Sequence, residues 1–319
     1  MILVGDIGGT NTRLALVTAE GARFHYHRIE RHPTPPDLGP LLRRYLAGTA
    51  VVAGAFCGAG PVDADGSIAL TNNPCALTIV GLSAAIAAPA VLINDFAAVA
   101  HAIPALSANQ LETIAGDTPF PDAPRIALGP GTGLGIATLV PRGNGWQVWA
   151  GEGGHVDLAP VDDAELAVWL RLRKRHGPLC VEAVISGVGF ERLHAACGGP
   201  EDWPASTIAG ADTDAAQQAR RLFTRWLGRI AANAALTTGA RGGVYLAGGI
   251  IPAWGARFDR AAFHAAFVDK VGYQAWLGAI PVSIIREPEP ALLGLARLAS
   301  TDFAQFSSDA TSRPHRSPP

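Results

Sequence analysis

Short apolar runs alternate with glycine-rich turns along most of the chain. The first half opens with apolar residues 2–5 and 13–17 on either side of a turn, which is the pattern of a β-hairpin. Residues 23–29 alternate between apolar and polar and predict a third strand. Further strands are expected at 51–56, 67–71 and 90–93, and helices at 37–46, 77–88 and 96–103.

The second half repeats this order. The apolar run 125–128 leads into another glycine-rich turn, and strands are expected at 136–140 and 147–150. A long helix is predicted for 214–238, because Asp212 or Thr213 can cap its start and Gly239 its end. The other elements expected are helices at 163–176, 181–185, 189–195, 261–268 and 291–298, and strands at 243–247 and 281–285.

The chain of 319 residues is long enough for two domains, and the repeated order predicts two α/β lobes. We expect a small lobe from residues 1–105 with about 291–300, and a large lobe from 106–290. From Thr301 the sequence is rich in polar residues and proline, so residues 301–319 are expected to form a disordered tail.

Composition and charge exclude several functions. The 27 acidic and 25 basic residues are well mixed, and the net charge is −2, so we expect neither a nucleic-acid nor a membrane partner. The cysteines (Cys57, Cys75, Cys180 and Cys197) contain no C-x-x-C pair, which argues against a disulfide framework or a zinc knuckle. The apolar start reaches Asp6 too soon for a signal peptide, so a cytoplasmic location is expected.

The stretch LVGDIGGTNTR (residues 3–13) combines one carboxylate with a glycine-rich turn at a strand end. Glycines let the backbone pass close to a ligand, and successive N–H groups in such a turn can bind an anion. The Asp6 carboxylate is suited to hold Mg²⁺, directly or through water. An ordinary tight hairpin would fit the two glycines equally well, so this motif alone leaves both interpretations open.

Two further turns favour a nucleotide. LGPGTGLG (residues 128–135) lies between two strands, and it lacks both the G-K-[ST] of a Walker loop and the helix that follows a Rossmann turn. In LAGGI (residues 246–250) the glycines would let a flat base approach the backbone. Three such turns, each after an apolar strand, predict a nucleotide-binding protein.

At this point the chain resembles the bacterial glucokinase family of the sugar kinase, Hsp70 and actin superfamily. The matching segments keep the family order from residue 2 to about 298; they are GDIGGTNTRLAL, LINDFAAVAHAIP, LGPGTGLGIA, GEGGHVDLAP, EAVISGVGFERL and VYLAGGI. The resemblance implies an α/β protein with the two-lobed actin-like ATPase (ribonuclease H-like) fold and a cleft between the lobes. The zinc-binding cysteine cluster of the related ROK family is not found in this sequence.

The resemblance also implies roles for single residues. Asp95 would be the general base for a sugar 6-hydroxyl, although a cap for the helix from Phe96 is the alternative. The residues implied to bind the sugar are Asn94, Asp95, Glu152, His155 and Glu182. Those implied to bind MgATP are Gly5, Asp6, Ile7, Gly8, Gly9, Thr10, Thr132 and Gly133, with Gly248 and Gly249 near the adenosine. A metal ligand or core histidine remains the alternative for His155, and a solvated helix residue for Glu182.

The implied activity is transfer of the γ-phosphoryl of MgATP to the 6-hydroxyl of D-glucose, the initial step of glycolysis, by a cytoplasmic homodimer. Pro74–Cys75 stand where the family commonly has an aromatic residue, so mannose, fructose or an N-acetylhexosamine is the alternative substrate. Asn72 is a further candidate sugar contact. A sugar-binding regulator without catalysis is the remaining alternative, although the first strand, starting at residue 2, leaves no room for the helix-turn-helix of related regulators.

Overall fold

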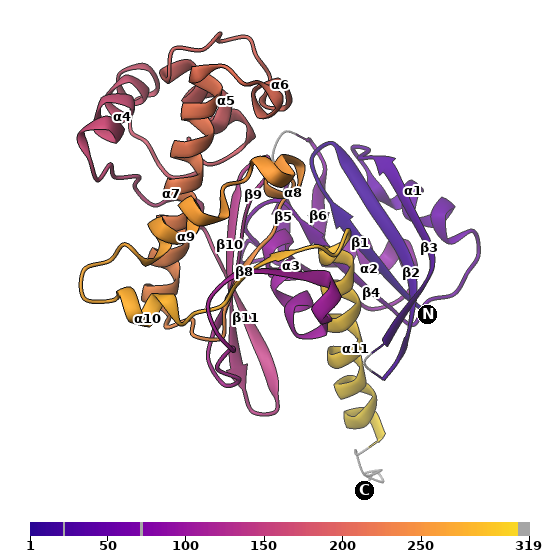
Figure 1. Cartoon of the computed structure of the whole chain (residues 1–319). Coiled ribbons are helices and arrows are strands. Elements are labelled where there is room, and N and C mark those ends of the chain that lie inside the picture. The colour runs from indigo at the N-terminus through magenta and orange to yellow at the C-terminus, as the bar shows by residue number, and fades with distance from the viewer. Residues whose placement is uncertain (22, 71–72, 312–319) are drawn as a thin grey trace, which may run out of the picture. The chain divides into compact units, whose positions relative to one another are not determined.

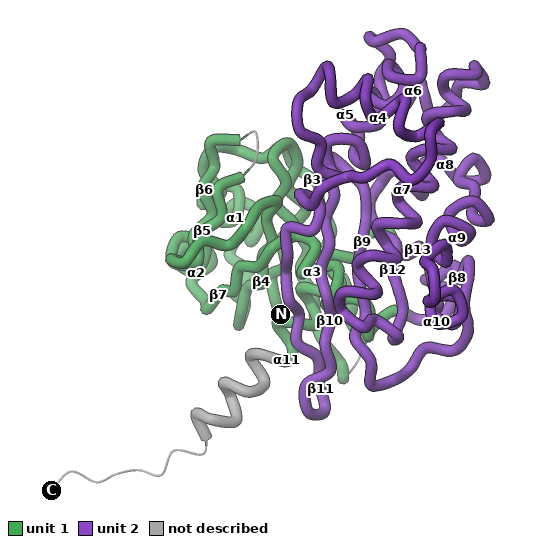
Figure 2. The backbone as a smooth tube through the Cα atoms, turned by 90° about the vertical axis from the view of Figure 1, so that its left-hand side faces the viewer, with its two compact units in different colours: residues 1–106, 288–319 green, residues 107–287 purple. Residues whose placement is uncertain are grey.

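The chain divides into two compact units (Figure 2). The structure, a computed structural model, describes residues 1–21, 23–70 and 73–311, of which 302–311 are described as backbone alone. Unit 1 comprises residues 1–106 and the segment from residue 288, and unit 2 comprises residues 107–287. The sequence predicts that the chain passes between the lobes after residue 105 and near residue 291, and the structural division falls after residues 106 and 287.

Unit 1 is built on a five-stranded sheet with the order β3-β2-β1-β4-β7. The central strand β1 pairs antiparallel with β2 and parallel with β4, and β4 pairs parallel with β7. The strands are β1 (Ile2–Ile7), β2 (Asn11–Glu20), β3 (Arg23–Pro33), β4 (Ala53–Gly58) and β7 (Ala90–Asn94), beside a separate hairpin of β5 (Ser67–Ala69) and β6 (Ala76–Thr78). The helices are α1 (Leu38–Leu46), α2 (Ile79–Ile86), α3 (Asp95–Ala102) and α11 (Pro290–Thr311).

Helices cover both faces of this sheet. Leu3, Ile7 and Phe56 pack into one buried cluster with side chains of α1 and α2. Helix α11 packs beside α3 and against β1 and β4 (Figure 1). Because side chains alternate along a strand, Asp6 and Cys57 point to the face opposite Ile7 and Phe56.

Unit 2 repeats this strand order. Its sheet runs β11-β10-β9-β12-β13, with β8 added antiparallel at the edge. Again the central strand, β9, pairs with a hairpin partner on one side and a parallel strand on the other. The strands are β8 (Leu111–Ala115), β9 (Arg125–Pro130), β10 (Leu134–Arg142), β11 (Gly145–Gly151), β12 (Val244–Leu246) and β13 (Val282–Ile285). The repeat expected from the hydrophobic pattern is therefore present in the strand order.

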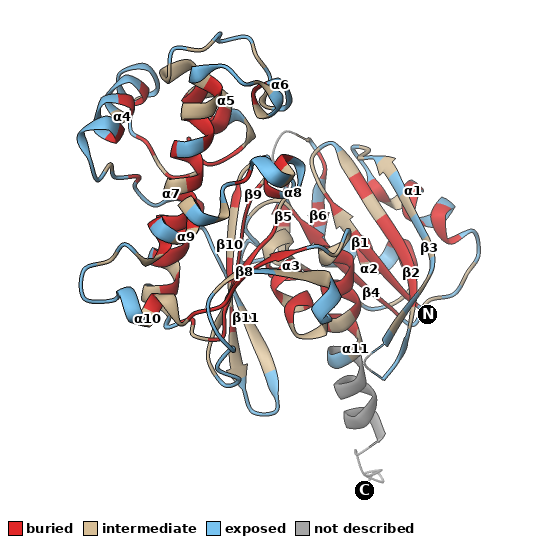
Figure 3. Cartoon of the chain, in the orientation of Figure 1, coloured by how far each residue is buried: buried red, intermediate tan, exposed pale blue. Residues whose placement is uncertain are grey.

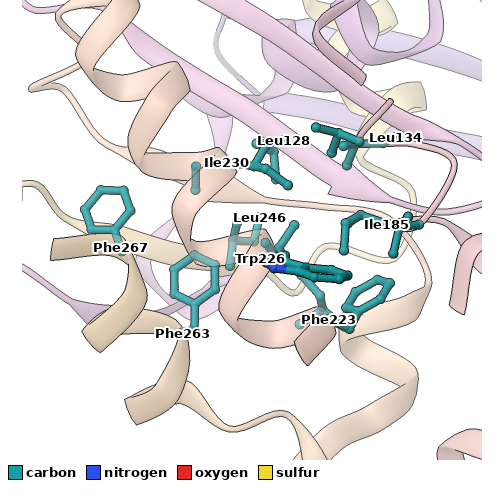
Figure 4. Close-up of a cluster of buried hydrophobic side chains, with 14 of the residues drawn as sticks. Leu128, Leu134, Ile185, Phe223, Trp226, Ile230, Leu246, Phe263 and Phe267 are labelled. Atoms are coloured by element: carbon teal, nitrogen blue, oxygen red, sulfur yellow. The ribbon is translucent and has the colours of Figure 1, made fainter. Parts of the chain in front are cut away.

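The core of unit 2 forms around one long helix. Phe223, Trp226 and Ile230 of α7 lie in one cluster with Leu128 and Leu246 of the sheet (Figure 4), and Figure 3 shows how much of α7 is buried. The helices are α4 (Asp163–His176), α5 (Gly187–Ala196), α6 (Ala205–Gly210), α7 (Asp214–Thr238), α8 (Ile250–Trp254), α9 (Arg260–Val268) and α10 (Gln274–Gly278). Short 3-10 turns cover Ile103–Ala105, Ala108–Gln110, Gly153–His155 and Gly255–Arg257.

The predicted helices with clear caps are confirmed. Helix α7 begins after Thr213, whose hydroxyl accepts from the N–H of Ala216 at 3.3 Å, and ends at Gly239 with φ +65°. The helix predicted at 181–185 is wrong, because the Ser186 side chain caps α5 and the helix begins only at Gly187. The short elements β6, β8, α6, α8 and α10 were not predicted from the sequence.

The prediction for the last helix is also wrong. We expected it to end at Leu298 and the chain to be disordered from Thr301, but α11 continues to Thr311. After Gly294 the next glycine or proline is Pro314, so nothing local stops the helix earlier. The hydroxyl of Ser300 bonds back to the Ala296 carbonyl at 2.8 Å, which lets this polar residue remain helical. The rest of the expected tail, 312–319, lies outside the described residues.

In the part of the chain that the structure describes, no helix is both long and apolar enough to cross a membrane.

We expect His101, the histidine of α3, to make the free energy of unfolding depend on pH. Burial, together with the charge of Arg297, lowers the pKa of His101 from 6.5 to about 4. Between these two values the unfolded chain binds a proton that the folded chain does not, so stability falls as the pH falls through this window. We expect His101→Gln to remove about 2 kcal/mol of the loss between pH 7 and pH 4.5, measured by urea unfolding. The exposed His25→Gln variant should keep that loss, and an unchanged loss in His101→Gln would contradict the assignment.

Candidate active site

The first group of candidate residues lies at the carboxyl ends of three parallel strands in unit 1. The pairing register sets Asp6 of β1 beside Cys57 of β4, and Cys57 beside Ile93 of β7. Asn94 ends β7 and Asp95 begins α3. Ligands of α/β sheets bind at this edge, because the strand ends and the loops that follow them converge there.

Asn94 caps helix α3. Its side-chain oxygen accepts from the N–H groups of Phe96 at 2.9 Å and Ala97 at 3.1 Å, and its amide donates to the Gly60 carbonyl at 3.1 Å. The alternative role for Asp95 as the cap is therefore wrong: Asp95 is the first helical residue, and it also accepts from Phe96 N–H at 2.8 Å. The cap sets the position of the Asp95 carboxylate at the helix start, where the helix dipole favours negative charge.

Asp6 is held by a cation and a thiol. Arg13 Nη1 lies 3.0 Å from Asp6 Oδ2, and Arg13 Nε lies 3.3 Å from Glu289 Oε2. The Cys57 thiol donates to Asp6 Oδ1 at 3.5 Å. Burial, reinforced by the nearby carboxylates of Asp6 and Asp95, raises the pKa of Cys57 well above its usual value, so the thiol keeps its proton. This network orients Asp6 without covering it, since 18% of its side chain is exposed.

The donors around Asp6 fit a magnesium ion that arrives with a nucleotide. Mg²⁺ in such sites uses one or two carboxylates and completes its shell with water and substrate phosphates. Among the described residues no group of three or more His, Cys, Asp or Glu side chains is arranged to hold a metal by itself. A single carboxylate beside a glycine-rich turn meets the first requirement, and water and phosphate oxygens would complete the shell.

The first glycine-rich turn is shorter than the sequence suggested. Gly5 and Ile7 lie inside β1, and a Cβ added to Gly5 would stand 2.7 Å from the Phe56 ring, so this glycine serves packing. Ile7 is fully buried. The turn itself is Gly8 to Thr10, closed by a bond from Gly8 N–H to the Asn11 carbonyl at 2.9 Å.

The second group lies in unit 2 around Glu182. Its carboxylate accepts from Leu134 N–H at 2.7 Å, and His155 Nε2 lies 3.9 Å from the other carboxylate oxygen. Its own N–H donates to the Gly154 carbonyl at 2.8 Å. A Cβ added to Gly133 would stand 2.4 Å from Glu182 Oε2, so a larger residue at this position would collide with the carboxylate. Glu182 is therefore not a solvated helix residue; it joins the second turn to the segment of His155.

Two other predicted residues of unit 2 lie at the surface. Thr132 and Glu152 are exposed. The second glycine-rich turn also bonds to α5, because Gly187 N–H donates to the Gly131 carbonyl at 2.8 Å.

The third glycine-rich turn contacts the second. Gly248 has φ +83°, and a Cβ there would stand 2.3 Å from the Pro130 carbonyl, so only glycine fits at this approach. Gly249 precedes α8 with open space around it. Because Pro130 ends β9 directly before the second turn, these two turns form one continuous surface of backbone in unit 2.

The structure thus gathers the candidates into one group in each unit. Sequence reasoning missed four residues of unit 1, because no local pattern marks their contacts. Arg13 and Cys57 contact Asp6, and Thr34 and Asn73 contact the first glycine-rich turn. Asn72 lies outside the described residues.

Two sheets with one strand order, each with a glycine-rich hairpin turn at the end of its central strand, define the actin-like α/β fold of sugar kinases. A family profile described as Glucokinase matches residues 3–302, and the chain belongs to the glucokinase family. It is 40% identical to a glucokinase of Ralstonia nicotianae, covering 95% of each chain, and 39% identical to one of Chromobacterium violaceum, covering 97% of this chain and 92% of the other.

Solved structures agree with this fold. A glucokinase from an Antarctic psychrotroph is 31% identical, with a TM-score of 0.85 over 94% of this chain and 98% of that one. A ROK family glucokinase from Streptomyces griseus, in complex with glucose and AMPPNP, is 20% identical, with a TM-score of 0.63 over 94% of this chain and 99% of that one.

Proposed function

We propose that the protein is a glucokinase that transfers the γ-phosphoryl group of ATP to the 6-hydroxyl of D-glucose and releases glucose 6-phosphate and ADP. Family membership over nearly the whole chain supports the reaction. The observation that carries the mechanism is the edge of the first sheet, where Asp95 follows β7 while Asp6 and the glycine-rich turn end β1. A carboxylate beside a phosphate-binding turn is what phosphoryl transfer to a hydroxyl needs.

In unit 1, Asp95 would accept the proton of the 6-hydroxyl as its oxygen bonds to the γ-phosphorus and the bond to ADP breaks. Phosphoryl transfer depends mainly on alignment and on stabilising charge, so Gly8 to Thr10 would hold phosphate oxygens through N–H groups. A magnesium ion held by Asp6, directly or through water, would neutralise charge on the phosphates.

In unit 2, the hexose hydroxyls would be held by Glu152, His155 and Glu182. Carboxylates accept from hydroxyl pairs, and a site built to bond hydroxyls rejects analogues that lack them. Thr132 and Gly133 would contact phosphate, and Gly248 and Gly249 would lie near the adenosine. From unit 1, Asn94 would add a contact through its second amide proton, since its first amide proton bonds to Gly60 and its oxygen is occupied by the helix cap.

The position of Cys75 bears on the choice of sugar. Cys75 is only 3% exposed and packs in the cluster formed with side chains of α1 and α2. Together with Leu38 and Leu82 it lines a pocket of about 370 Å³. A small side chain in place of an aromatic one therefore changes packing between these helices. Glucose is the first choice because the matched relatives are glucokinases, and mannose, fructose and N-acetylhexosamine are the alternatives.

Cofactors, assembly and location complete the proposal. A fold neighbour bound to AMPPNP supports ATP as the donor. Magnesium, a homodimer and a cytoplasmic location are proposed from the resemblance to the family.

We expect ADP release from MgATP to depend on glucose, measured with a coupled assay over a panel of hexoses. A glucose-dependent rate above those with mannose, fructose and N-acetylglucosamine would support a glucokinase. A faster rate with another hexose would move the proposal to that sugar. Calorimetric binding of a hexose without any turnover would favour the sugar-binding regulator instead.

A further inference from the structure

The carbonyl groups of the first glycine-rich turn accept hydrogen bonds from two residues outside the turn. The Gly8 carbonyl accepts from the Thr34 hydroxyl at 2.7 Å, and the Thr10 carbonyl accepts from Thr34 N–H at 3.0 Å. Between them, the Gly9 carbonyl accepts from the Asn73 side-chain amide at 2.8 Å. Three consecutive carbonyls of the turn are therefore held by two residues that lie far from it in sequence.

These hydrogen bonds to the carbonyl groups determine the direction of the N–H groups of the turn. A peptide unit is planar and trans, so its N–H is opposite its C=O. With the carbonyls of residues 8–10 directed at Thr34 and Asn73, the N–H groups of Gly9, Thr10 and Asn11 point the other way. Within the described chain nothing accepts a hydrogen bond from the N–H of Gly9 or Thr10. Successive N–H groups that face one way form an anion-binding concavity.

Thr34 and Asn73 are themselves anchored. Thr34 follows Pro33, which pairs with Asn11 across the β2–β3 ladder, and its hydroxyl contacts that of the fully buried Thr12 at 3.0 Å. Because the Thr34 hydroxyl donates to Gly8, the Thr12 hydroxyl donates in this pair. The Asn73 amide also donates to the Thr34 carbonyl at 3.3 Å, and the Asn73 oxygen accepts from Cys75 N–H at 2.8 Å.

We propose that Thr34 and Asn73 are positioning residues that preset the turn at Gly8 to Thr10 for a phosphate group of the nucleotide. Neither residue needs to touch the nucleotide. The inference rests on the proposed function, because that function makes the bound anion the phosphate chain of ATP. Glycine peptides rotate easily, so without the hydrogen bonds from Thr34 and Asn73 the turn would become ordered only when the nucleotide binds. The conformational entropy lost in that step would weaken the affinity for the nucleotide.

The test measures affinity for magnesium AMPPNP and, separately, for glucose by calorimetry. Thr34→Val and Asn73→Ala each remove a donor to the turn, and each should weaken nucleotide binding about five- to tenfold, the effect of one lost hydrogen bond. Glucose affinity should stay within about twofold, since Thr34 and Asn73 bond to none of the residues proposed to bind glucose in either unit. Thr34→Ser keeps the hydroxyl and should bind nucleotide like the wild type.

A matched control lies on the same hairpin. Thr18 contacts His27 through its hydroxyl at 2.9 Å at the exposed end of the strands, so Thr18→Val loses a comparable bond away from the turn and should leave nucleotide affinity unchanged. Thermal unfolding of each variant checks that it is folded.

Three outcomes would overturn the inference. Unchanged nucleotide affinity in both Thr34→Val and Asn73→Ala would overturn this inference and leave the proposed function standing. An equal loss of glucose and nucleotide affinity, with a lowered unfolding temperature, would show a general structural role. A folded wild type that binds no nucleotide would overturn the proposed function together with it.

Discussion

Asp95→Asn should lower kcat for glucose phosphorylation by about 10²–10⁴-fold, the contribution of general-base catalysis. Asparagine has nearly the same shape and can still accept from Phe96 N–H, as Asp95 does at 2.8 Å, so the start of α3 should be preserved. It cannot take the proton of the sugar hydroxyl. We therefore expect KM for glucose and for ATP to change only a few-fold, in an assay of initial rates with both substrates varied.

A suitable control is Asp37→Asn in the same unit. Asp37 caps α1 by accepting from Gly39 N–H at 2.9 Å, a role that asparagine fills equally well, so this variant should keep wild-type kcat. Wild-type kcat in Asp95→Asn would refute the assignment of the base. Loss of glucose binding with normal folding would instead make Asp95 a binding residue.

Glu165→Leu should destabilise the protein by about 3–5 kcal/mol, because it leaves a buried cation without its partner. Glu165 is fully buried on α4, and its carboxylate contacts Arg229 of α7 at 2.6 Å and 3.0 Å. It also accepts from the Trp226 indole at 2.7 Å. The side chain of Arg229 is only 8% exposed, so water cannot replace the lost carboxylate. Urea unfolding followed by circular dichroism measures the change.

Two further variants separate the pair from its surroundings. The double variant Glu165→Leu with Arg229→Leu removes both charges and should cost clearly less than the sum of the single changes. Arg225 also lies 3.1 Å from Glu165, but 38% of its side chain is exposed, so Arg225→Leu should cost less than about 1 kcal/mol. Additive single effects, or an Arg225→Leu loss as large as that of Glu165→Leu, would argue against a buried ion pair.

The elements that were found from the sequence carry their own local signals. Helix α7 has a capping threonine at 213 and a glycine at 239, and α4 shows apolar residues at helical spacing between clear ends. The strands β1 and β7 were found because their apolar runs stop at the polar residues Asp6 and Asn94. Caps and apolar runs act over a few residues, so they are visible without the fold.

Elements without such signals were missed. Strand β8 is an edge strand of half-buried residues, and it exists through pairing with β13 and through ion pairs of Glu112 with Arg260 and Arg286. Residues 181–185 look helical in isolation, but the N–H groups of Val181 and Glu182 donate to the carbonyls of Val156 and Gly154. Contacts with distant backbone override the local preference in both places.

By itself, the sequence determined the family of this protein, the repeated α/β pattern and the glycines and carboxylates at the strand ends, because these depend on residue type and local spacing. Tertiary structure alone decided how those residues are used. It brings the Glu182 carboxylate onto the turn at Gly133, and it brings Thr34 and Asn73 onto the turn at Gly8 to Thr10. Such contacts join segments tens of residues apart, and their partners are backbone groups that every residue carries, so they leave no mark in the order of the side chains.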